Sequence, residues 1–445
     1  MKLPRRWIWL AGLVVVLGLL VAACGDDDGD GDDDGDTPVD GETPAATQEL
    51  TTDFGVSDTE IKLGMTIAQS VDPVASVFAP VLPAMRAYFE KLNQEDNGVC
   101  NRQITLIDVD DQYAPDLALQ GAQKLVQQDE VVAFVGNLGT AAVTGQVDFI
   151  NDPNGDGDTS DGVPHLFLST GAAKWDDPDQ WPWTIGYIPD YVSEGSVLAG
   201  YANDNLPAGS TAGVLYQNDD FGEDGRDGFK EAFAGEVIIE QPYDAGSPDI
   251  TSQMANLRDA DPDILLLYSI GLSTRSAYVY MEENDWKPQI LSTYVNPASL
   301  LATLIGGGEE PDQLARGYAQ LEGTVSTNYL IDPVADADDP AFVEHVRIME
   351  TYGGPNPEQL SLYGQSLAEL VVETLRIACE NGDMTRPGVL AAAESIQGFR
   401  SSVLFPGFEI NLSPTDHFSI QALYPVEIQS DGTLEAVGDI TSVEE

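Results

Sequence analysis

Residues 151–162, NDPNGDGDTSDG, carry the clearest metal-like spacing in the chain. The oxygen-bearing positions are Asp152, Asn154, Asp156, Asp158, Ser160 and Asp161. The first three alternate and Gly157 follows them, as at the start of a calcium loop. The twelfth position holds Val163, where an EF-hand loop needs a bidentate glutamate. Two interpretations stay open: a structural calcium site, or an acidic surface insertion.

The turn VVAFVGNLGTAAVTG, residues 131–145, carries a second chemical pattern. A strand pattern ends at Gly136, and a helix pattern begins at Gly139 and Thr140, where Thr140 can serve as a cap. Free N–H groups and the helix dipole at such a turn bind anions, including a carboxylate. A simple strand–helix turn remains an equal alternative. Neither phosphate-binding glycine motif occurs here, which argues against a nucleotide.

Signs of catalysis are few. The three histidines, His165, His345 and His417, lie outside any HExxH motif, and no GxSxG motif is present. A lipid-anchored hydrolase would need a serine or metal centre that we do not find in the sequence. We therefore expect a protein that is not an enzyme and requires no cofactor, with calcium as the one ion to consider.

The N-terminus carries export signals. A basic start followed by an uncharged apolar run from Trp7 to Leu20 is typical of a secretory signal. The residues VAAC, ending at Cys24, are similar to a bacterial lipobox, in which the cysteine becomes a lipid-modified N-terminus. We predict a signal peptide over residues 1–23 and a lipid anchor at Cys24 on the outer face of the cell membrane. An ordinary signal peptide with an incidental cysteine is the alternative.

The segment after the signal is acidic, and so is the chain as a whole. Residues 24–54 contain many Asp and Gly and almost no large apolar side chain, which predicts a solvated acidic tether. The chain has 75 acidic and 19 basic residues, for a net charge of −56. This field repels nucleic acid and anionic lipid, so we expect no nucleic-acid partner and membrane attachment through lipid only.

Two further cysteines, Cys100 and Cys379, lie in the exported part of the chain. An oxidising compartment favours a disulfide between them, and two buried free thiols are the alternative.

Strand and helix patterns alternate from residue 55 onward. The expected strands are 61–68, 103–111, 131–136, 164–170, 211–217, 236–240, 263–270 and 289–294. This order predicts parallel sheets covered by helices on both faces. We therefore predict an α/β protein with two Rossmann-like lobes.

Several long segments together resemble the type I periplasmic-binding proteins of ABC importers, in the leucine/isoleucine/valine-binding group. They are DTEIKLGMT (58–66), DDQYAPDLA (110–118), KLVQQDEVVAFVGNLGT (124–140), VPHLFLSTGA (163–172), LYQNDDFGEDGRDGF (215–229) and LFPGFEINLSPTDH (404–417). The resemblance covers roughly residues 55–440. It implies two lobes joined by three crossovers, with the ligand cleft between them.

On that plan, residues 55–186 plus 328–417 form lobe 1, and residues 187–327 plus 418–445 form lobe 2. Both cysteines then fall in lobe 1, which favours the disulfide.

The resemblance also implies ligand-binding residues. The grip on a ligand carboxylate corresponds to Gly139 and Thr140, and a backbone contact in the next loop corresponds to Gly171. The aromatic side chain that covers the ligand corresponds to Phe221, and Tyr187 is a further candidate. Ordinary packing is the alternative for both aromatic residues and for Tyr294.

The positions that hold the ammonium group in amino-acid-binding relatives differ in this chain. Ala173 replaces a threonine and Tyr294 replaces an acidic residue, whereas Ile270 corresponds to a second aromatic position of lobe 2 outside that pair. This implies a ligand that need not be an α-amino acid, although Asp190 or Asp219 could replace the missing carboxylate.

We therefore expect a monomeric substrate-binding lipoprotein of an ABC importer. It would close around a small carboxylate-bearing ligand, such as a branched-chain or other amino acid or a related acid or amide, and deliver it to the permease. A ligand-sensing module of the same fold for a signalling partner is the alternative.

Overall fold

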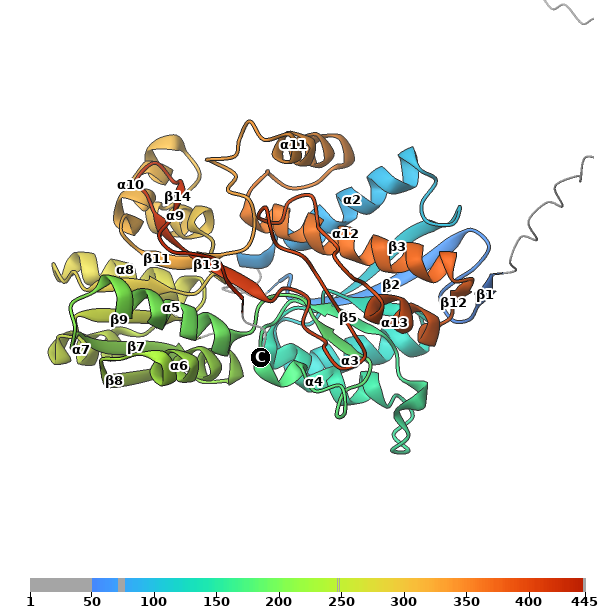
Figure 1. Ribbon diagram of the computed structural model, residues 1–445, viewed down its shortest axis with the longest axis horizontal. Helices are drawn as coiled ribbons and strands as arrows, with labels where there is room; N and C mark the ends of the chain where they lie inside the picture. Colours follow the sequence, from blue (N-terminus) through green and yellow to red (C-terminus); the bar gives the residue numbers. More distant parts are fainter. Residues whose placement is uncertain (1–49, 71–76, 246, 248, 443–445) are drawn as a thin grey trace, which may run out of the picture. The chain divides into compact units, whose positions relative to one another are not determined.

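Two β-sheets organise the chain, which this computed structural model describes at residues 50–70, 77–245, 247 and 249–442 (Figure 1). Residues 48–445 form one compact unit. The predicted signal peptide, Cys24 and residues 24–49 of the predicted tether lie outside the described residues. We call the part around the five-stranded sheet the first lobe and the part around the eight-stranded sheet the second lobe.

The first sheet is entirely parallel, with strand order β3-β2-β4-β5-β6. Its strands are β2 (Glu60–Ile67), β3 (Gln103–Asp110), β4 (Ala133–Val135), β5 (His165–Leu168) and β6 (Thr184–Gly186). The β2 side chains from Leu63 to Ile67 are buried in succession rather than at alternate positions. Helices on both faces of the sheet explain this continuous burial.

Six α-helices belong to the first lobe among the described residues. They are α2 (Val81–Glu95), α3 (Pro115–Gln127), α4 (Thr140–Asn151), α11 (Pro340–Tyr352), α12 (Gln359–Glu380) and α13 (Arg386–Glu394). Short 3-10 turns η1 (Thr159–Asp161) and η2 (Ala173–Trp175) follow α4 and β5. Proline at the first position of α3, with its fixed φ, explains why this helix starts there.

The second sheet is mixed, with strand order β14-β13-β11-β10-β9-β7-β8, and β15 also pairs with β13. Its strands are β7 (Thr211–Gln217), β8 (Glu236–Tyr243), β9 (Ile264–Tyr268), β10 (Gln289–Ser292), β11 (Val325–Asn328), β13 (Ala422–Ile428), β14 (Leu434–Ala436) and β15 (Thr441–Ser442). The strands from β7 to β11 are parallel, and β13 runs antiparallel to β11. The chain leaves the second lobe at the end of β11 and returns at the start of β13, which explains the reversal.

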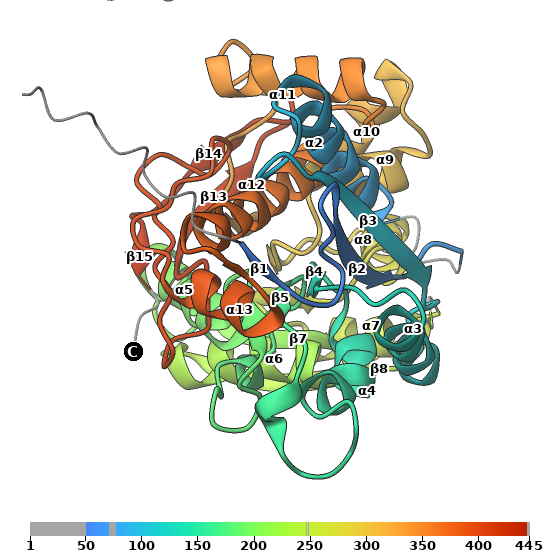
Figure 2. The ribbon, with the colours of Figure 1, turned by 90° about the vertical axis from the view of Figure 1, so that its right-hand side faces the viewer.

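Six further helices of the described part of the chain belong to the second lobe. They are α5 (Tyr191–Asn205), α6 (Asp220–Ala232), α7 (Thr251–Ala260), α8 (Leu272–Glu283), α9 (Ala298–Gly306) and α10 (Pro311–Leu321). Figure 2 shows the two lobes from the side, with the first-lobe helix α12 near the centre. Among the described residues, no helix combines the length and apolar character needed to cross a bilayer.

The chain passes between the sheets after β6, after β11 and before β13. The first and third passages lie side by side. The N–H of Gly186 donates to the carbonyl of His417 at 2.8 Å, and the N–H of Ser419 donates back to Gly186 at 3.1 Å. The second passage is held by Asn328, whose side-chain Nδ2 donates to the carbonyl of Leu330 at 2.8 Å.

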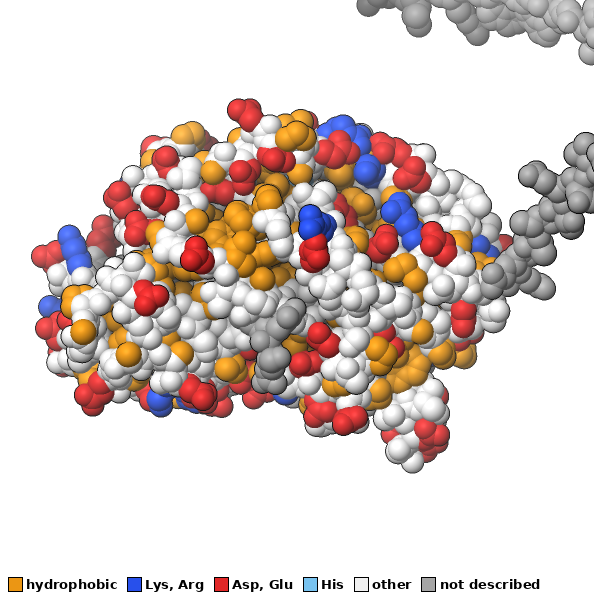
Figure 3. Space-filling view, viewed as in Figure 1, with side chains coloured by type: hydrophobic (Ala, Val, Ile, Leu, Met, Phe, Trp, Pro, Cys, Tyr) orange, Lys and Arg blue, Asp and Glu red, His pale blue; other side chains and the backbone are white. Residues whose placement is uncertain are grey.

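A disulfide joins Cys100 to Cys379, with their Cα atoms 6.4 Å apart. It ties the segment after α2 to the C-terminal end of α12. The short strand β12 (Asp383–Met384) follows Cys379 in sequence and pairs in parallel with β1 (Thr51–Thr52). On the face seen in Figure 3, acidic side chains are spread over both lobes with few basic ones between them.

Candidate ligand-binding site

A cavity lies where the two sheets meet. Its walls come from the segments at the carboxyl ends of the strands and from the helix starts that follow them, where open parallel sheets bind ligands. The lining residues are Phe78, Tyr113, Leu138, Gly139, Thr140, Ser169, Ile188, Tyr191, Phe221, Ile270, Tyr294, Val295, Pro297, Asn328, Tyr329, Leu330, Gln359, Leu360 and Tyr363.

The first-lobe wall contains the N-terminus of α4. Gly139 has φ +96°, and a Cβ atom there would lie 2.3 Å from the ring of Tyr113, so this position needs glycine. The N–H of Gly139 donates to the carbonyl of Ser169 at 3.2 Å. The hydroxyls of Thr140 and Thr170 are 2.6 Å apart. The N–H of Gly139 and the hydroxyl of Thr140 thus already have partners inside the protein, and their role as a carboxylate grip stays a prediction.

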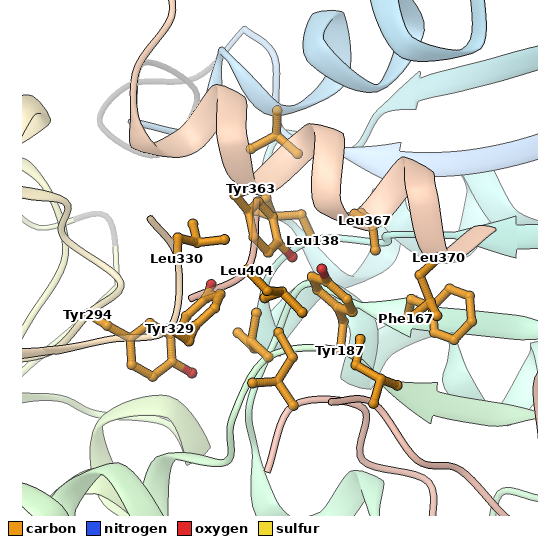
Figure 4. Packing of buried hydrophobic residues seen from close by; sticks show 14 of the residues in the cluster. Leu138, Phe167, Tyr187, Tyr294, Tyr329, Leu330, Tyr363, Leu367, Leu370 and Leu404 are labelled. Atoms are coloured by element: carbon orange, nitrogen blue, oxygen red, sulfur yellow. The ribbon is translucent and has the colours of Figure 1, made fainter. Parts of the chain in front are cut away.

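An aromatic wall comes from the second lobe and the passages between the lobes. Phe221 is 1% exposed, and its ring centroid lies 5.0 Å from that of Tyr191 and 5.1 Å from that of Tyr268. The rings of Tyr294 and Tyr329 meet edge to face at 5.5 Å, as Figure 4 shows. Such rigid rings favour a ligand with apolar or aromatic surface.

Tyr294 is positioned by a buried carboxylate. Its N–H donates to Oε1 of Glu194 at 2.6 Å, and its hydroxyl donates to the carbonyl of Pro189 at 2.6 Å. Glu194 also accepts bonds from the hydroxyls of Tyr268, Thr293 and Thr327. Burial raises the pKa of Glu194 to about 7, against the opposing effect of these hydrogen bonds.

Of the eight residues predicted to bind ligand, five line the cavity: Gly139, Thr140, Phe221, Ile270 and Tyr294. The other three lie beside it. Gly171 accepts a hydrogen bond from the N–H of Tyr191 at 2.8 Å, and the N–H of Ala173 donates to Oδ2 of Asp224 at 3.0 Å. Tyr187 packs in the first-lobe core, where its hydroxyl donates to Ser366 at 2.7 Å (Figure 4).

Sequence reasoning missed several lining tyrosines, above all Tyr113, Tyr191, Tyr329 and Tyr363. Tyr113 and Tyr329 follow strands and Tyr191 starts a helix, positions that could have indicated these three residues. Tyr363 lies on α12, whose strongly apolar sequence resembles that of an ordinary core helix. Only the packing of α12 beside the sheet ends shows its role.

Charged side chains are absent from the described lining. Asp190 and Asp219, the two candidates for an ammonium partner, instead cap helices. Asp190 accepts from the N–H of Ser193 at 2.8 Å, and Asp219 accepts from the N–H of Gly222 at 3.4 Å and from Nε2 of Gln217 at 2.7 Å. Burial raises the pKa of both carboxyls. None of the three histidines lines the cavity.

The Asp-rich insert follows α4 and lies away from the cavity. Asp152 accepts bonds from the N–H groups of Gly155 at 2.9 Å and Gly157 at 2.9 Å, and Asn154 accepts from that of Asp156 at 2.9 Å. In the described part of the chain, no three His, Cys, Asp or Glu side chains converge as a metal site would require. Calcium binding at this insert stays a prediction.

Two lobes with a closed, uncharged cleft between them define a class of protein that binds a small molecule by enclosing it. Residues 60–433 match the family described as periplasmic binding protein. The chain belongs to this family and has the type I periplasmic-binding fold. Its members are binding proteins of the space outside the cytoplasm.

Solved structures share the fold. A fatty acid ABC transporter substrate-binding protein from Thermomonospora curvata is 22% identical with a TM-score of 0.73, covering 89% of this chain and 95% of its own. A branched chain amino acid ABC transporter protein from Thermus thermophilus with bound valine is 17% identical, with a TM-score of 0.72 and coverages of 87% and 97%. A solute binding protein from Rhodopseudomonas palustris BisB5 in complex with 3,4-dihydroxy benzoic acid is 18% identical, with a TM-score of 0.68 and coverages of 87% and 99%. A comparison with curated proteins found no match.

Proposed function

We propose that this chain is the lipid-anchored substrate-binding protein of an ABC importer. It closes around a mostly apolar small molecule and delivers it to a membrane permease. The observation that carries this proposal is the lining of the cavity, in which aromatic and aliphatic side chains dominate and no described residue is charged.

An α-amino acid fits this cavity poorly. Its ammonium group would be buried without a carboxylate, at a cost of several kcal/mol. Hydrogen-bonding groups at the wall are engaged with each other: Tyr294 with Pro189, and Ser169 with Gly136 and Gly139. A related acid or amide has an apolar body and one polar end, so it loses less solvation free energy when it enters the cavity.

The ligands named for similar structures support a molecule with an apolar body and one polar end. Their titles name a fatty acid, valine and 3,4-dihydroxy benzoic acid. Two of these three compounds combine an apolar or aromatic body with a polar end and have no ammonium group. The uncharged lining of this chain favours those two over valine.

Calorimetric titration tests the proposal. The purified protein is unfolded and refolded to remove ligand that copurifies, because bound ligand raises apparent stability. Leucine and phenylalanine are then compared with 4-methylpentanoic acid, 3-phenylpropanoic acid and the two matching amides. We expect acids or amides to bind at least about tenfold more tightly than the amino acids, a difference of ~1.4 kcal/mol. Tighter binding of the amino acids overturns the proposal.

A matched pair of variants locates the site. Phe221→Leu removes a ring from the cavity wall and should weaken binding of every ligand. Phe54→Leu makes the same change at a side chain that is 52% exposed and outside the cavity, so binding should stay unchanged.

Two parts of the proposal need their own tests. Cys24→Ser should release the protein from the membrane if Cys24 carries the lipid. A signalling role is the second candidate, because the same closure could be presented to a receptor. Neighbouring genes for a permease and an ATPase favour import, and a neighbouring histidine kinase favours sensing.

A further inference from the structure

Tyr113 reaches the wall of the cavity from a turn between β3 and α3. Both Gln112, with φ +53°, and Tyr113, with φ +58°, lie in the left-handed region of backbone conformation. Residues with a Cβ atom rarely adopt this region, and two in succession are less favourable still because the penalty applies to each. Strain of this kind persists only where the surrounding structure holds it, and it is typical of functional sites.

Two consecutive carboxylates hold this turn. The N–H of Gln112 donates to Oδ1 of Asp110 at 3.1 Å, and the N–H of Tyr113 donates to Oδ1 of Asp111 at 2.8 Å. The carbonyl of Asp111 also accepts from the N–H of Ala114 at 2.9 Å, directly before α3 begins. Asp111 therefore fixes the backbone of Tyr113 from both its side chain and its main chain.

The surroundings of Asp111 do not favour an acid. Its exposed fraction is 0%, and its Oδ2 has no hydrogen-bond partner among the described residues. A buried polar oxygen without a partner destabilises a fold. Stability alone therefore does not explain an aspartate at this position, whereas its bond to the N–H of Tyr113 does.

The turn sets the place of the Tyr113 ring. A Cβ atom at Gly139 would lie 2.3 Å from Cε2 of this ring, so the ring packs directly on the start of α4. Gly139 and Thr140, the predicted carboxylate grip, form the neighbouring part of the cavity wall. Another backbone conformation at Tyr113 would move the ring off Gly139 and open this side of the cavity.

We propose that Asp111, which does not itself line the cavity, is a positioning residue for ligand binding: it holds Tyr113 in the left-handed turn that places the ring against Gly139. This rests on the proposed function, because the role it assigns concerns the same cavity. It means that ligand affinity depends on a buried carboxyl that makes no contact with the ligand.

A double-mutant cycle tests the inference, with 3-phenylpropanoic acid and its amide as probes in calorimetric titration. We expect Tyr113→Leu to weaken binding at least about tenfold, and Asp111→Leu to weaken it by a similar factor. If Asp111 acts through the ring, adding Asp111→Leu to Tyr113→Leu should change the Kd less than about twofold. A merely structural role would instead lower the affinity by the same factor in both backgrounds.

Three further variants keep the result specific. Asp111→Asn retains an oxygen that accepts from the N–H of Tyr113, so its Kd should stay within about twofold of the wild-type value. Gln112→Gly added to Asp111→Leu should recover part of the lost affinity, because glycine adopts the left-handed region without strain. Asp431→Leu removes the same kind of bond outside the cavity, from the N–H of Thr433 at 3.0 Å, and should leave the Kd unchanged.

Hydrogen exchange examines the turn without any ligand. Mass spectrometry of peptides covering residues 110–118 should show the amide of Tyr113 exchanging at least about tenfold faster in Asp111→Leu than in the wild type. In Asp111→Asn it should exchange at the wild-type rate. Asp111→Ala replaces Asp111→Leu in both experiments if the leucine variant does not fold.

The outcomes separate this inference from the proposed function. Equal losses of affinity on Asp111→Leu with and without the Tyr113 ring overturn the inference, and so does unchanged exchange of the Tyr113 amide in that variant. If neither probe binds while leucine does, the proposed choice of ligand is wrong. The same cycle run with leucine then decides the role of Asp111.

Discussion

The N–H of Ala173 donates to Oδ2 of Asp224 at 3.0 Å, which joins the loop after β5 in the first lobe to helix α6 in the second. Next to it, Nζ of Lys174 forms an ion pair with Asp220 and donates to Oγ1 of Thr144 at 2.9 Å. These contacts close the lobes on each other without using the ligand. They therefore raise the affinity by stabilising the closed state rather than by contacting the ligand.

Removing the ion pair between the lobes should weaken binding modestly. We expect Lys174→Met to raise the Kd about two- to fivefold, because partly exposed ion pairs contribute ~0.5–1 kcal/mol. The loss should be largest at low salt, where screening is weakest. Titration at two salt concentrations measures it. Lys287→Met is the control, because Lys287 pairs only with exposed Asp285 on the surface. An unchanged Kd for Lys174→Met would show that this contact does not stabilise closure.

Glu194 should make the protein more stable at mildly acidic pH. Burial raises its pKa from 4.5 to about 7, so the folded protein holds this proton more strongly than the unfolded chain does. The stabilisation is fully present below pH ~4.5 and is lost as pH rises through ~7. Burial likewise raises the pKa of Asp111 to about 7 and of Asp224 to about 6. Both carboxyls therefore also lower the stability of the protein as the pH rises.

Unfolding by urea between pH 5 and pH 8 measures this dependence. Glu194→Gln should reduce the change in the free energy of unfolding between pH 5 and pH 8 by on the order of 3 kcal/mol. The amide oxygen can accept from Tyr294 and Thr327, and the hydroxyls of Tyr268 and Thr293 can rotate to accept from the amide nitrogen. Glu435→Gln, at an exposed strand position, should leave the slope unchanged. A wild-type protein whose stability rises from pH 5 to pH 8 would contradict the prediction.

Reducing the disulfide should destabilise the protein without changing its ligand. Cys100 and Cys379 are 279 residues apart in sequence, so the bridge restricts the unfolded chain strongly. We expect Cys100→Ser to lower the free energy of unfolding by about 2–5 kcal/mol. Adding a reducing agent to the wild type should produce the same loss and should leave the variant unaffected. If the reducing agent shifts the variant equally, the effect has another origin.

Calcium at the Asp-rich insert is expected to be structural. The insert lies outside the cavity, so calcium should protect it from proteolysis and leave ligand affinity unchanged. Limited proteolysis with calcium or with a chelator measures the first effect, and titration measures the second. Asp152→Asn combined with Asp156→Asn should abolish the protection. Equal cleavage with and without calcium would instead favour a plain acidic insertion.

The local sequence predicted a segment's structure correctly where a single local cause decides it. The predicted strand 211–217 matches β7 because its apolar run is buried between helices. The strand predicted over 289–294 ends at Ser292, and Tyr294 lies beyond it. There the hydrogen bond from Tyr294 to Glu194 replaces strand pairing, and residues that distant in sequence give no local signal.

The sequence by itself determined the two-lobed α/β class, the family, and the glycine and threonine at the start of α4. Those features depend on periodicity, on turn chemistry and on long matching segments, all of which are read along the chain. Only the tertiary structure decided which groups meet at the cleft. It brought Tyr191 from the start of α5 to Gly171 and into the same cavity wall as Thr140, and it placed Tyr363 of α12 beside the sheet ends. These contacts depend on how separate elements pack, and packing is set by the whole fold rather than by any one segment.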